Sequence, residues 1–122
     1  MNEFEVIIEL GAEGGSLALH GIRTEQGWLF SRHLVDWTPE LINEGRIQGK
    51  STCVDSWDAA LCLLDQYPWY KLSPIVIHPD FKDRIWVAVQ QRLHDDGEIS
   101  KSKLKRWYEF CHHSFASDGS GA

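Results

Sequence analysis

Alternating apolar and charged residues near the start of the chain constrain the fold more than any other feature of the sequence. Within FEVIIEL, residues 4–10, apolar side chains fall on alternate positions, namely Phe4, Val6, Ile8 and Leu10. Glu5 and Glu9 take the positions between them, and Ile7 breaks the alternation. Because successive side chains of a strand point to opposite faces, this segment predicts a strand with one buried face.

Two turn sequences extend this strand into a meander. GAEGG, residues 11–15, precedes SLALHGIR, in which Leu17 and Leu19 alternate with Ala18 and His20. The turn TEQG, residues 24–27, leads into a third segment, GWLFSRHLVD. Strand-like segments joined by short glycine-containing turns predict three antiparallel strands.

The middle of the chain predicts a β-α-β segment. A polar connector from Pro39 to Lys50 leads into a short extended piece that ends at Asp55. Asp55 or Ser56 can cap the helix that follows, whose apolar residues recur at helical spacing as Trp57, Ala60, Leu61 and Leu64. Pro68 ends this helix, and SPIVIHP then predicts a compact buried strand.

Two helices complete the predicted fold. Pro79 and Asp80 open the first, which ends at Asp96 and has the apolar stripe Phe81, Ile85, Val89 and Leu93. Ser100 can cap the second, whose stripe is Leu104, Trp107, Tyr108 and Cys111.

We therefore predict an α+β fold. An antiparallel meander is followed by the β-α-β segment and by two C-terminal helices packed on one sheet face. A single domain is expected over residues 1–115, followed by a disordered tail over residues 116–122.

Charge narrows the class of partner. The net charge is -6, and residues 1–60 carry ten acidic and four basic side chains. Nucleic-acid binding needs clustered positive charge, so we expect no nucleic-acid partner and instead a protein partner of basic character. The apolar runs fall short of the roughly 18 residues of a membrane span, and the acidic N-terminus lacks the basic region of a signal peptide. We expect a cytoplasmic protein that is a monomer or a weak dimer.

The segment EGRIQGKST, residues 44–52, ends like a phosphate-binding P-loop. That motif needs four residues between its glycines, whereas Gly45 and Gly49 enclose three, and Glu44 would repel a phosphate. We therefore expect no nucleotide and no other cofactor.

A block from residue 54 to residue 81 contains the motifs VDSW, YPW and HPDF. In this arrangement it resembles a group of small uncharacterised bacterial proteins. The resemblance spans about a quarter of the chain. It implies a bacterial, cytoplasmic origin and transfers no catalytic residue.

His78 and Asp80 are the candidates for catalysis, because they lie where a strand passes into a helix. A carboxylate beside a histidine fixes its tautomer and raises its basicity, as a general base requires. In the alternative interpretation, Asp80 favours the N-terminus of its helix and has no chemical role.

The run Cys111-His112-His113 contains zinc-ligand residue types. Adjacent helical residues point in directions about 100° apart, so the three cannot converge on one ion. We expect no metal site, and Cys111 belongs to the predicted apolar stripe.

Aromatic residues suggest a binding surface. We expect the loop between Pro68 and Pro74 to form its rim, with Trp57, Trp69, Tyr70 and His78 as the binding residues. The alternative is that Trp69 folds back onto the core.

A basic run, SKSKLKR, supplies Lys101, Lys103, Lys105 and Arg106 to the start of the last helix. This run is either a solvated helix face or the binding site of an acidic ligand or partner.

The sequence favours a binding protein over an enzyme, since the chain is small and acidic and has more aromatic residues than its core requires. We expect a protein-interaction module of inhibitor or immunity type. A small hydrolase that uses His78 and Asp80 is the alternative.

Overall fold

The computed structural model describes residues 3–12, 14–35, 52–96 and 101–112. The chain divides into two compact units, Met1–His78 and Pro79–Ala122. The expectation of one domain over residues 1–115 stays a prediction. The predicted connector from Pro39 to Lys50, the cap at Ser100 and the tail over residues 116–122 lie outside the described residues.

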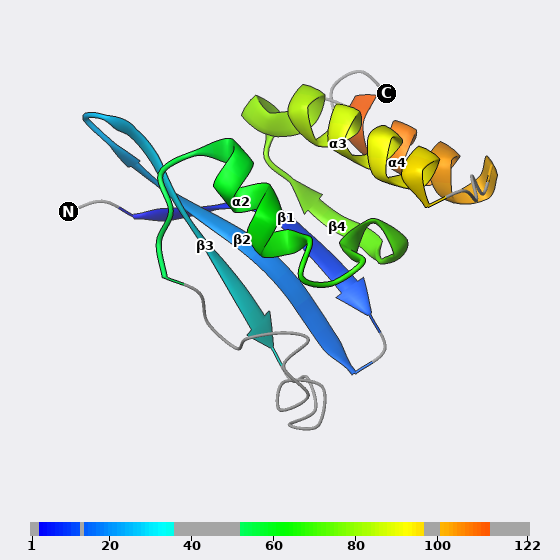
Figure 1. Ribbon diagram of the computed structural model, residues 1–122, viewed down its shortest axis with the longest axis horizontal. Coiled ribbons are helices and arrows are strands. Elements are labelled where there is room, and N and C mark those ends of the chain that lie inside the picture. The colour runs from blue at the N-terminus through cyan, green and yellow to red at the C-terminus, as the bar shows by residue number, and fades with distance from the viewer. Residues whose placement is uncertain (1–2, 13, 36–51, 97–100, 113–122) are drawn as a thin grey trace, which may run out of the picture. The chain divides into compact units, whose positions relative to one another are not determined.

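The first unit contains a four-stranded antiparallel sheet (Figure 1). Its strands are β1 (Phe4–Ala12), β2 (Gly15–Thr24), β3 (Gly27–Val35) and β4 (Ser73–Ile77). They lie side by side in the order β3-β2-β1-β4. The predicted meander of the first three strands is confirmed.

A β-bulge in β1 explains why Ile7 breaks the alternation. Val6 pairs with His20 and Ile8 pairs with Leu19, so Ile7 has no position of its own in the register. The extra residue shifts the phase of the strand. Ile7 and Ile8 are both buried as a result, while Phe4, which the simple alternation placed on the buried face, is 59% exposed.

The turn between β2 and β3 is held by Thr24. Its hydroxyl donates to the carbonyl of Gly27 at 2.8 Å and accepts from the amide of Gln26 at 3.2 Å. Gly27 has a φ of 123°, a backbone conformation that residues with a Cβ atom rarely adopt. This turn sets the register in which Gly21 lies opposite Phe30.

The strand predicted from SPIVIHP exists as β4, but it is not buried throughout. It pairs with β1 and, in the described sheet, forms an edge, so Ile75 and Val76 remain 50% and 41% exposed. Pro74 is tolerated because an edge strand need not use every backbone donor.

The helix of the predicted β-α-β segment is α2 (Trp57–Leu64). Ser56 caps it, since its hydroxyl accepts a hydrogen bond from the amide of Ala59 at 3.1 Å. The extended piece before it is reduced to a single bridge, in which Val54 pairs antiparallel with Phe30. This bridge and β4 therefore run in the same direction on opposite edges of the described sheet.

Helix α2 lies across one face of the sheet, as Figure 1 shows. Ala60 and Leu64 are buried. Arg32 reaches from β3 to the end of the helix, where its Nη1 donates to the carbonyl of Leu63 at 2.9 Å and to the side-chain oxygen of Gln66. A buried cation at a helix C-terminus satisfies carbonyl groups that have no partner within the helix. The short helix η1 (Trp69–Lys71) then leads into β4.

The second unit contains η2 (Pro79–Phe81), α3 (Lys82–Asp95) and α4 (Lys101–His112). The predicted stripe of the first helix is confirmed, because Phe81, Ile85, Val89 and Leu93 are all buried. In α4, Trp107 and Cys111 are buried, but Tyr108 is 49% exposed. Tyr108 therefore belongs to the surface and not to the predicted core stripe.

The α+β class, with two C-terminal helices, is confirmed. Among the described residues, no helix is long and apolar enough to cross a membrane.

Candidate functional site

A row of aromatic rings connects two of the predicted binding residues within the first unit. The ring of Trp57 meets Phe30 edge-on, with centroids 6.0 Å apart, and Phe30 stacks on Trp28 at 6.1 Å. Trp28 in turn meets His78 edge-on at 5.6 Å. Trp57 and His78, which are distant in sequence, are thus two ends of one packed row.

His78 forms a hydrogen bond with the carboxylate of Glu5, a partner that the sequence did not predict. His78 Nε2 lies 2.7 Å from Glu5 Oε1, and the His78 side chain is 11% exposed. Arg23 Nε donates to the other oxygen of Glu5 at 2.7 Å and its guanidinium lies over the ring of Trp28 at 4.6 Å. We expected Asp80 in this role, and that pairing stays a prediction. Asp80 lies exposed in η2.

The electrostatic environment keeps Glu5 ionised. Hydrogen bonds from Arg23, and secondarily from His78, lower the pKa of Glu5 from 4.5 to about 2. An ionised carboxylate fixes the orientation of the imidazole, as in a general-base pair. Arg23 shares the same carboxylate, which is the arrangement of a structural ion-pair cluster. The hydrogen bond to Glu5 therefore fixes the orientation of the His78 ring, but it is equally compatible with a structural role.

Trp69 is a core residue, as the alternative interpretation of its loop had it, and it does not belong to the binding surface. Its side chain is 0% exposed, and its indole N–H donates to Asp65 Oδ1 at 2.8 Å. Burial of a tryptophan is favourable when the indole N–H retains a hydrogen-bond partner. In this conformation Trp69 cannot contact a partner. Tyr70 meets it edge-on, with centroids 6.2 Å apart, and is half-buried.

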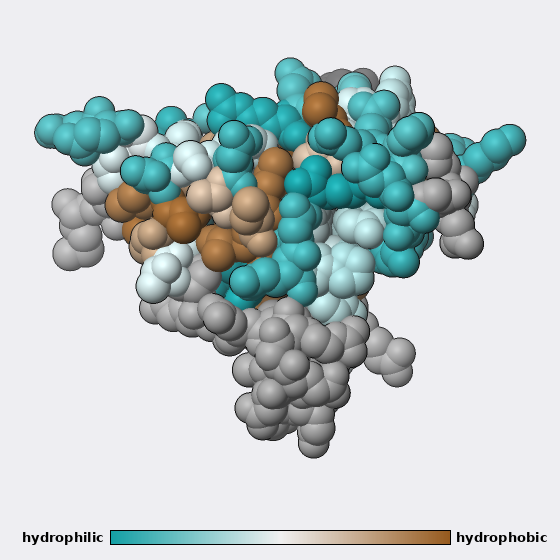
Figure 2. Space-filling view, viewed as in Figure 1, coloured by the Kyte–Doolittle hydropathy of each residue, from teal (hydrophilic) through white to brown (hydrophobic). Residues whose placement is uncertain are grey.

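The outward side of α2 is more apolar than a solvated helix requires. Asp58 is the one charged residue within Trp57–Leu64, and Cys62 is exposed. Half-buried apolar residues continue around the helix, namely Trp57, Ala59, Leu61 and Leu63. Figure 2 shows apolar surface over α2 and the segment before it, bordered by hydrophilic groups. We call these residues, with Asp55, Asp58 and Cys62, the α2 surface.

Three rings stack on the face of the sheet opposite to Trp28 and Phe30. Phe4 stacks on His20 with centroids 4.5 Å apart, and His20 stacks on His33 at 4.2 Å. Burial, and then the nearby His33, lower the pKa of His20, which favours its neutral form. This cluster was not predicted from the sequence, because only the pairing of three strands brings its members together.

Cys111 and His112 diverge, as the helical geometry predicts. Cys111 is buried, and burial raises the pKa of its thiol to about 12. His112 is exposed, stacks on Tyr108 at 4.1 Å, and its Nδ1 lies 2.9 Å from the carbonyl of that residue. His113 lies outside the described residues. The buried thiol is unsuited to act as a nucleophile.

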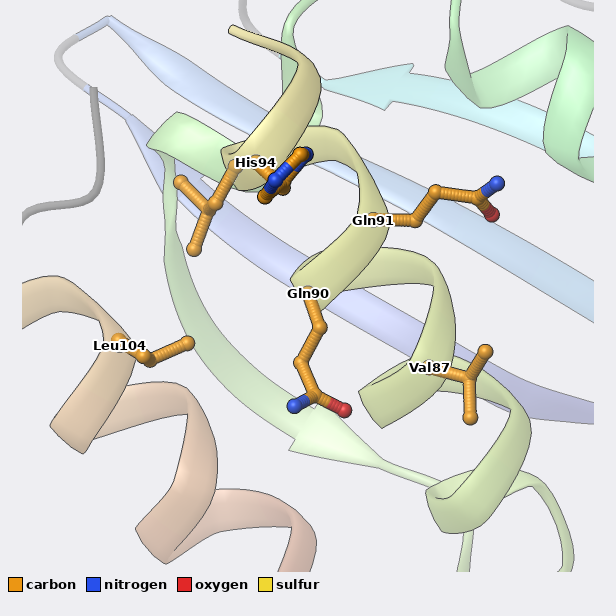
Figure 3. A pocket seen from close by; sticks show the side chains of 6 residues that line it. Val87, Gln90, Gln91, His94 and Leu104 are labelled. Carbon is orange, nitrogen blue, oxygen red and sulfur yellow. The ribbon is translucent and has the colours of Figure 1, made fainter. Parts of the chain in front are cut away.

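A groove between α3 and α4 was not predicted. Two adjoining hollows, with volumes of about 430 and 310 Å³, share Leu104. Figure 3 shows Gln90 and Leu104 directed from facing helices toward one of them. One feature of the sequence could have indicated the groove: Val87 is apolar but lies outside the predicted apolar stripe of its helix. In the structure Val87 is 60% exposed.

Comparison of the chain with protein-family models, with curated proteins and with solved structures found no match.

Proposed function

We propose that the chain is a protein-interaction module of inhibitor or immunity type, whose α2 surface docks a basic protein. The observation that carries this proposal is the composition and exposure of α2. A helix that is apolar on nearly every side is normally covered by other protein. Here Cys62 is exposed, and Ala59, Leu61 and Leu63 are half-buried.

The charge around this helix favours a basic partner. From residue 51 to residue 70 the sequence contains three aspartates and neither lysine nor arginine. Asp55 and Asp58 are exposed at the start of α2. Interfaces combine an apolar centre with a polar rim, and complementary charge accelerates association. A basic rim around an apolar centre is therefore the surface that would match α2.

Trp57 and Tyr70 belong to the proposed interface. Trp69 is buried beneath it and holds the neighbouring segment in place. The hydrogen bond from Trp69 to Asp65 ties the segment after α2 to the end of the helix. Such restraint lowers the entropy lost on binding, because the surface is already ordered. We further propose that the protein acts in the bacterial cytoplasm as a monomer or weak dimer.

Affinity capture with charge-reversed variants tests this proposal. The full-length chain, Asp58→Lys and the matched control Glu25→Lys would each be used on a lysate of the source organism. Glu25 is exposed in the turn between β2 and β3, so the control makes the same charge change away from α2. Captured proteins would be quantified by mass spectrometry.

We expect the wild type and Glu25→Lys to capture the same basic protein, and Asp58→Lys to capture at least about tenfold less of it. Equal loss in both variants would mean that only net charge matters. Equal capture by all three would remove α2 from the interface.

A small hydrolase is the second candidate, and the observation that favours it is the 2.7 Å hydrogen bond between His78 and Glu5. General-base catalysis contributes typically about 100-fold or more to a rate. Hydrolysis of activated esters by the purified chain should then fall by about that factor in His78→Asn. An unchanged rate in this variant would discard the candidate.

A further inference from the structure

We infer that the groove between α3 and α4 binds an acidic, amphipathic helix of a partner protein. This second surface lies entirely within Pro79–Ala122 and does not depend on the α2 surface. Its predicted ligand has the opposite charge to the partner proposed for α2.

Each helix contributes one continuous stripe to the groove. On α3 the stripe is Val87, Gln90, Gln91 and His94, and on α4 it is Lys101, Leu104, Lys105 and Tyr108. Both stripes follow the spacing i, i+3, i+4, i+7, which places four side chains on one face of a helix. Trp86 lines the groove where it meets Tyr108, with the two rings 5.5 Å apart.

The apolar part of the groove is exposed, and its aromatic ring is packed against two others. Val87 is 60% exposed and Tyr108 is 49% exposed. Tyr108 is held between two rings, because it stacks on His112 at 4.1 Å and meets Trp86 edge-on. An aromatic side chain that is already fixed loses little freedom on binding, as is typical of interface hot spots.

The charge of the groove selects the ligand. Among the described residues that line it, the charged ones are Lys101 and Lys105, in a chain whose net charge is -6. Both lie in the first two turns of α4, where the helix dipole disfavours positive charge. Their position therefore does not help the helix to form, whereas carboxylates of a ligand would interact favourably with both lysines and with the dipole.

The shape of the groove favours a helical ligand. Two helices packed side by side leave a furrow into which the side chains of a third helix fit. A segment from Val87 to His94 extends about 10 Å, so a ligand of two to three turns would fill it. Its apolar stripe would cover Val87, Leu104 and Tyr108, and its acidic flank would face the lysines.

A second copy of this chain is the less suitable occupant. A two-fold symmetric dimer places the same surface of both copies together, so Lys101 and Lys105 would face their own counterparts. Like charges in that position disfavour association. An acidic partner removes this repulsion.

Selection from a displayed peptide library tests the inference. The library would contain helical peptides of about 15 residues, four turns long, with a fixed stripe of leucines. The flanking positions would be randomised among Glu, Lys, Gln and Ala. The purified full-length chain would be the selecting protein, and the selected peptides would be titrated against variants.

We expect the enriched peptides to carry glutamate on one flank. Val87→Glu should weaken their binding at least about tenfold, and so should the pair Lys101→Glu with Lys105→Glu. Arg106→Glu is the matched control, because it changes charge in the same helix without lining the groove, and it should retain binding. Circular dichroism would verify that each variant is folded.

Three results would overturn the inference. They are a selection without enrichment, enriched peptides with neutral or basic flanks, and peptides that bind Val87→Glu as well as the wild type. Sedimentation equilibrium supplies a further test. A wild-type dimer that Val87→Glu dissociates would place a second copy in the groove and exclude the acidic helix.

Discussion

Aromatic side chains serve opposite purposes in the two units. In the first, Trp69 is 0% exposed and hydrogen-bonded to Asp65, so it holds the segment after α2 in place. In the second, Tyr108 is 49% exposed and packs against Trp86 and His112 on the surface of a helix pair. Residue type therefore does not identify a binding residue. A structural aromatic residue is distinguished by the burial of its ring and by an internal hydrogen-bond partner for its N–H or O–H group. An aromatic residue available to a ligand has an exposed ring.

The two candidate surfaces also differ in charge. The α2 surface has aspartates at its border, whereas lysines line the groove between α3 and α4. A small protein with an acidic and a basic apolar surface can recognise two chemically distinct partners.

The largest expected effect is a difference in the free energy of unfolding between variants of Trp69 and of Tyr108. Trp69→Ala should lower the free energy of unfolding by about 3–5 kcal/mol, because it leaves a cavity and removes the donor to Asp65. Tyr108→Ala should lower it by about 1 kcal/mol or less, since only partly exposed ring contacts are lost. Urea denaturation followed by circular dichroism measures both. Equal losses of unfolding free energy in the two variants would contradict the assignment of Trp69 to the core and of Tyr108 to the surface.

A smaller effect is expected from two glycines in the sheet. A Cβ atom at Gly21 would lie 2.8 Å from Trp28 Cε3 and 2.9 Å from Ile7 Cδ1. Gly21→Ala should therefore destabilise the first unit by about 1–3 kcal/mol through overpacking. Gly11→Ala is the matched control, because the Cδ1 atom that it would approach belongs to half-exposed Ile75, which can turn away. If the control lost as much stability, tight packing around Gly21 would not be the cause.

Stability at low pH should depend on the ion-pair cluster that Glu5 forms with Arg23 and His78. The pKa of Glu5 is about 2 in the folded protein, against 4.5 for an ordinary glutamate. Its stabilising contribution is therefore complete above pH 4.5 and is lost as the pH falls toward 2. Thermal unfolding across this range should show a steeper decline for the wild type than for Glu5→Gln. Parallel curves would show that Arg23 and His78 do not stabilise the carboxylate.

The smallest effect on stability is expected from thiol modification. Cys53 and Cys62 are exposed, whereas Cys111 is buried and has a pKa of about 12. Iodoacetamide at neutral pH should modify the two exposed thiols without changing the melting temperature, and should reach Cys111 only after unfolding. Intact-mass measurement counts the modified thiols. Rapid modification of all three would show that the region around Cys111 opens readily.

Local patterns in the sequence were sufficient to predict most of the secondary structure. The three strands, the cap at Ser56 and the buried stripe from Phe81 to Leu93 follow from periodicity and capping rules, which depend on neighbouring residues. The bulge at Ile7 and the edge position of β4 depend on how strands pair. Those pairings join residues that are distant in sequence, so local patterns do not determine them.

The candidate sites were harder to predict for the same reason. His78 was identified as a notable residue, but its partner Glu5 lies 73 positions earlier in the chain. Trp69 was named as a binding residue with burial in the core as the stated alternative, and the structure shows the alternative. Its hydrogen bond to Asp65 was not predicted. The groove required two helices to be placed side by side before its stripes became visible.

Photochemical cross-linking from Cys62 tests the proposed role of α2 most directly. A benzophenone would be attached to Cys62 in a Cys53→Ser chain and irradiated in a lysate of the source organism. Val35→Cys, on the sheet, carries the same label in a Cys53→Ser, Cys62→Ser chain as the control. We predict that the Cys62 label alone cross-links one prominent basic protein, and that Asp58→Lys abolishes the product. The same products from both label positions, or a product at Cys62 that persists in Asp58→Lys, would contradict docking through α2.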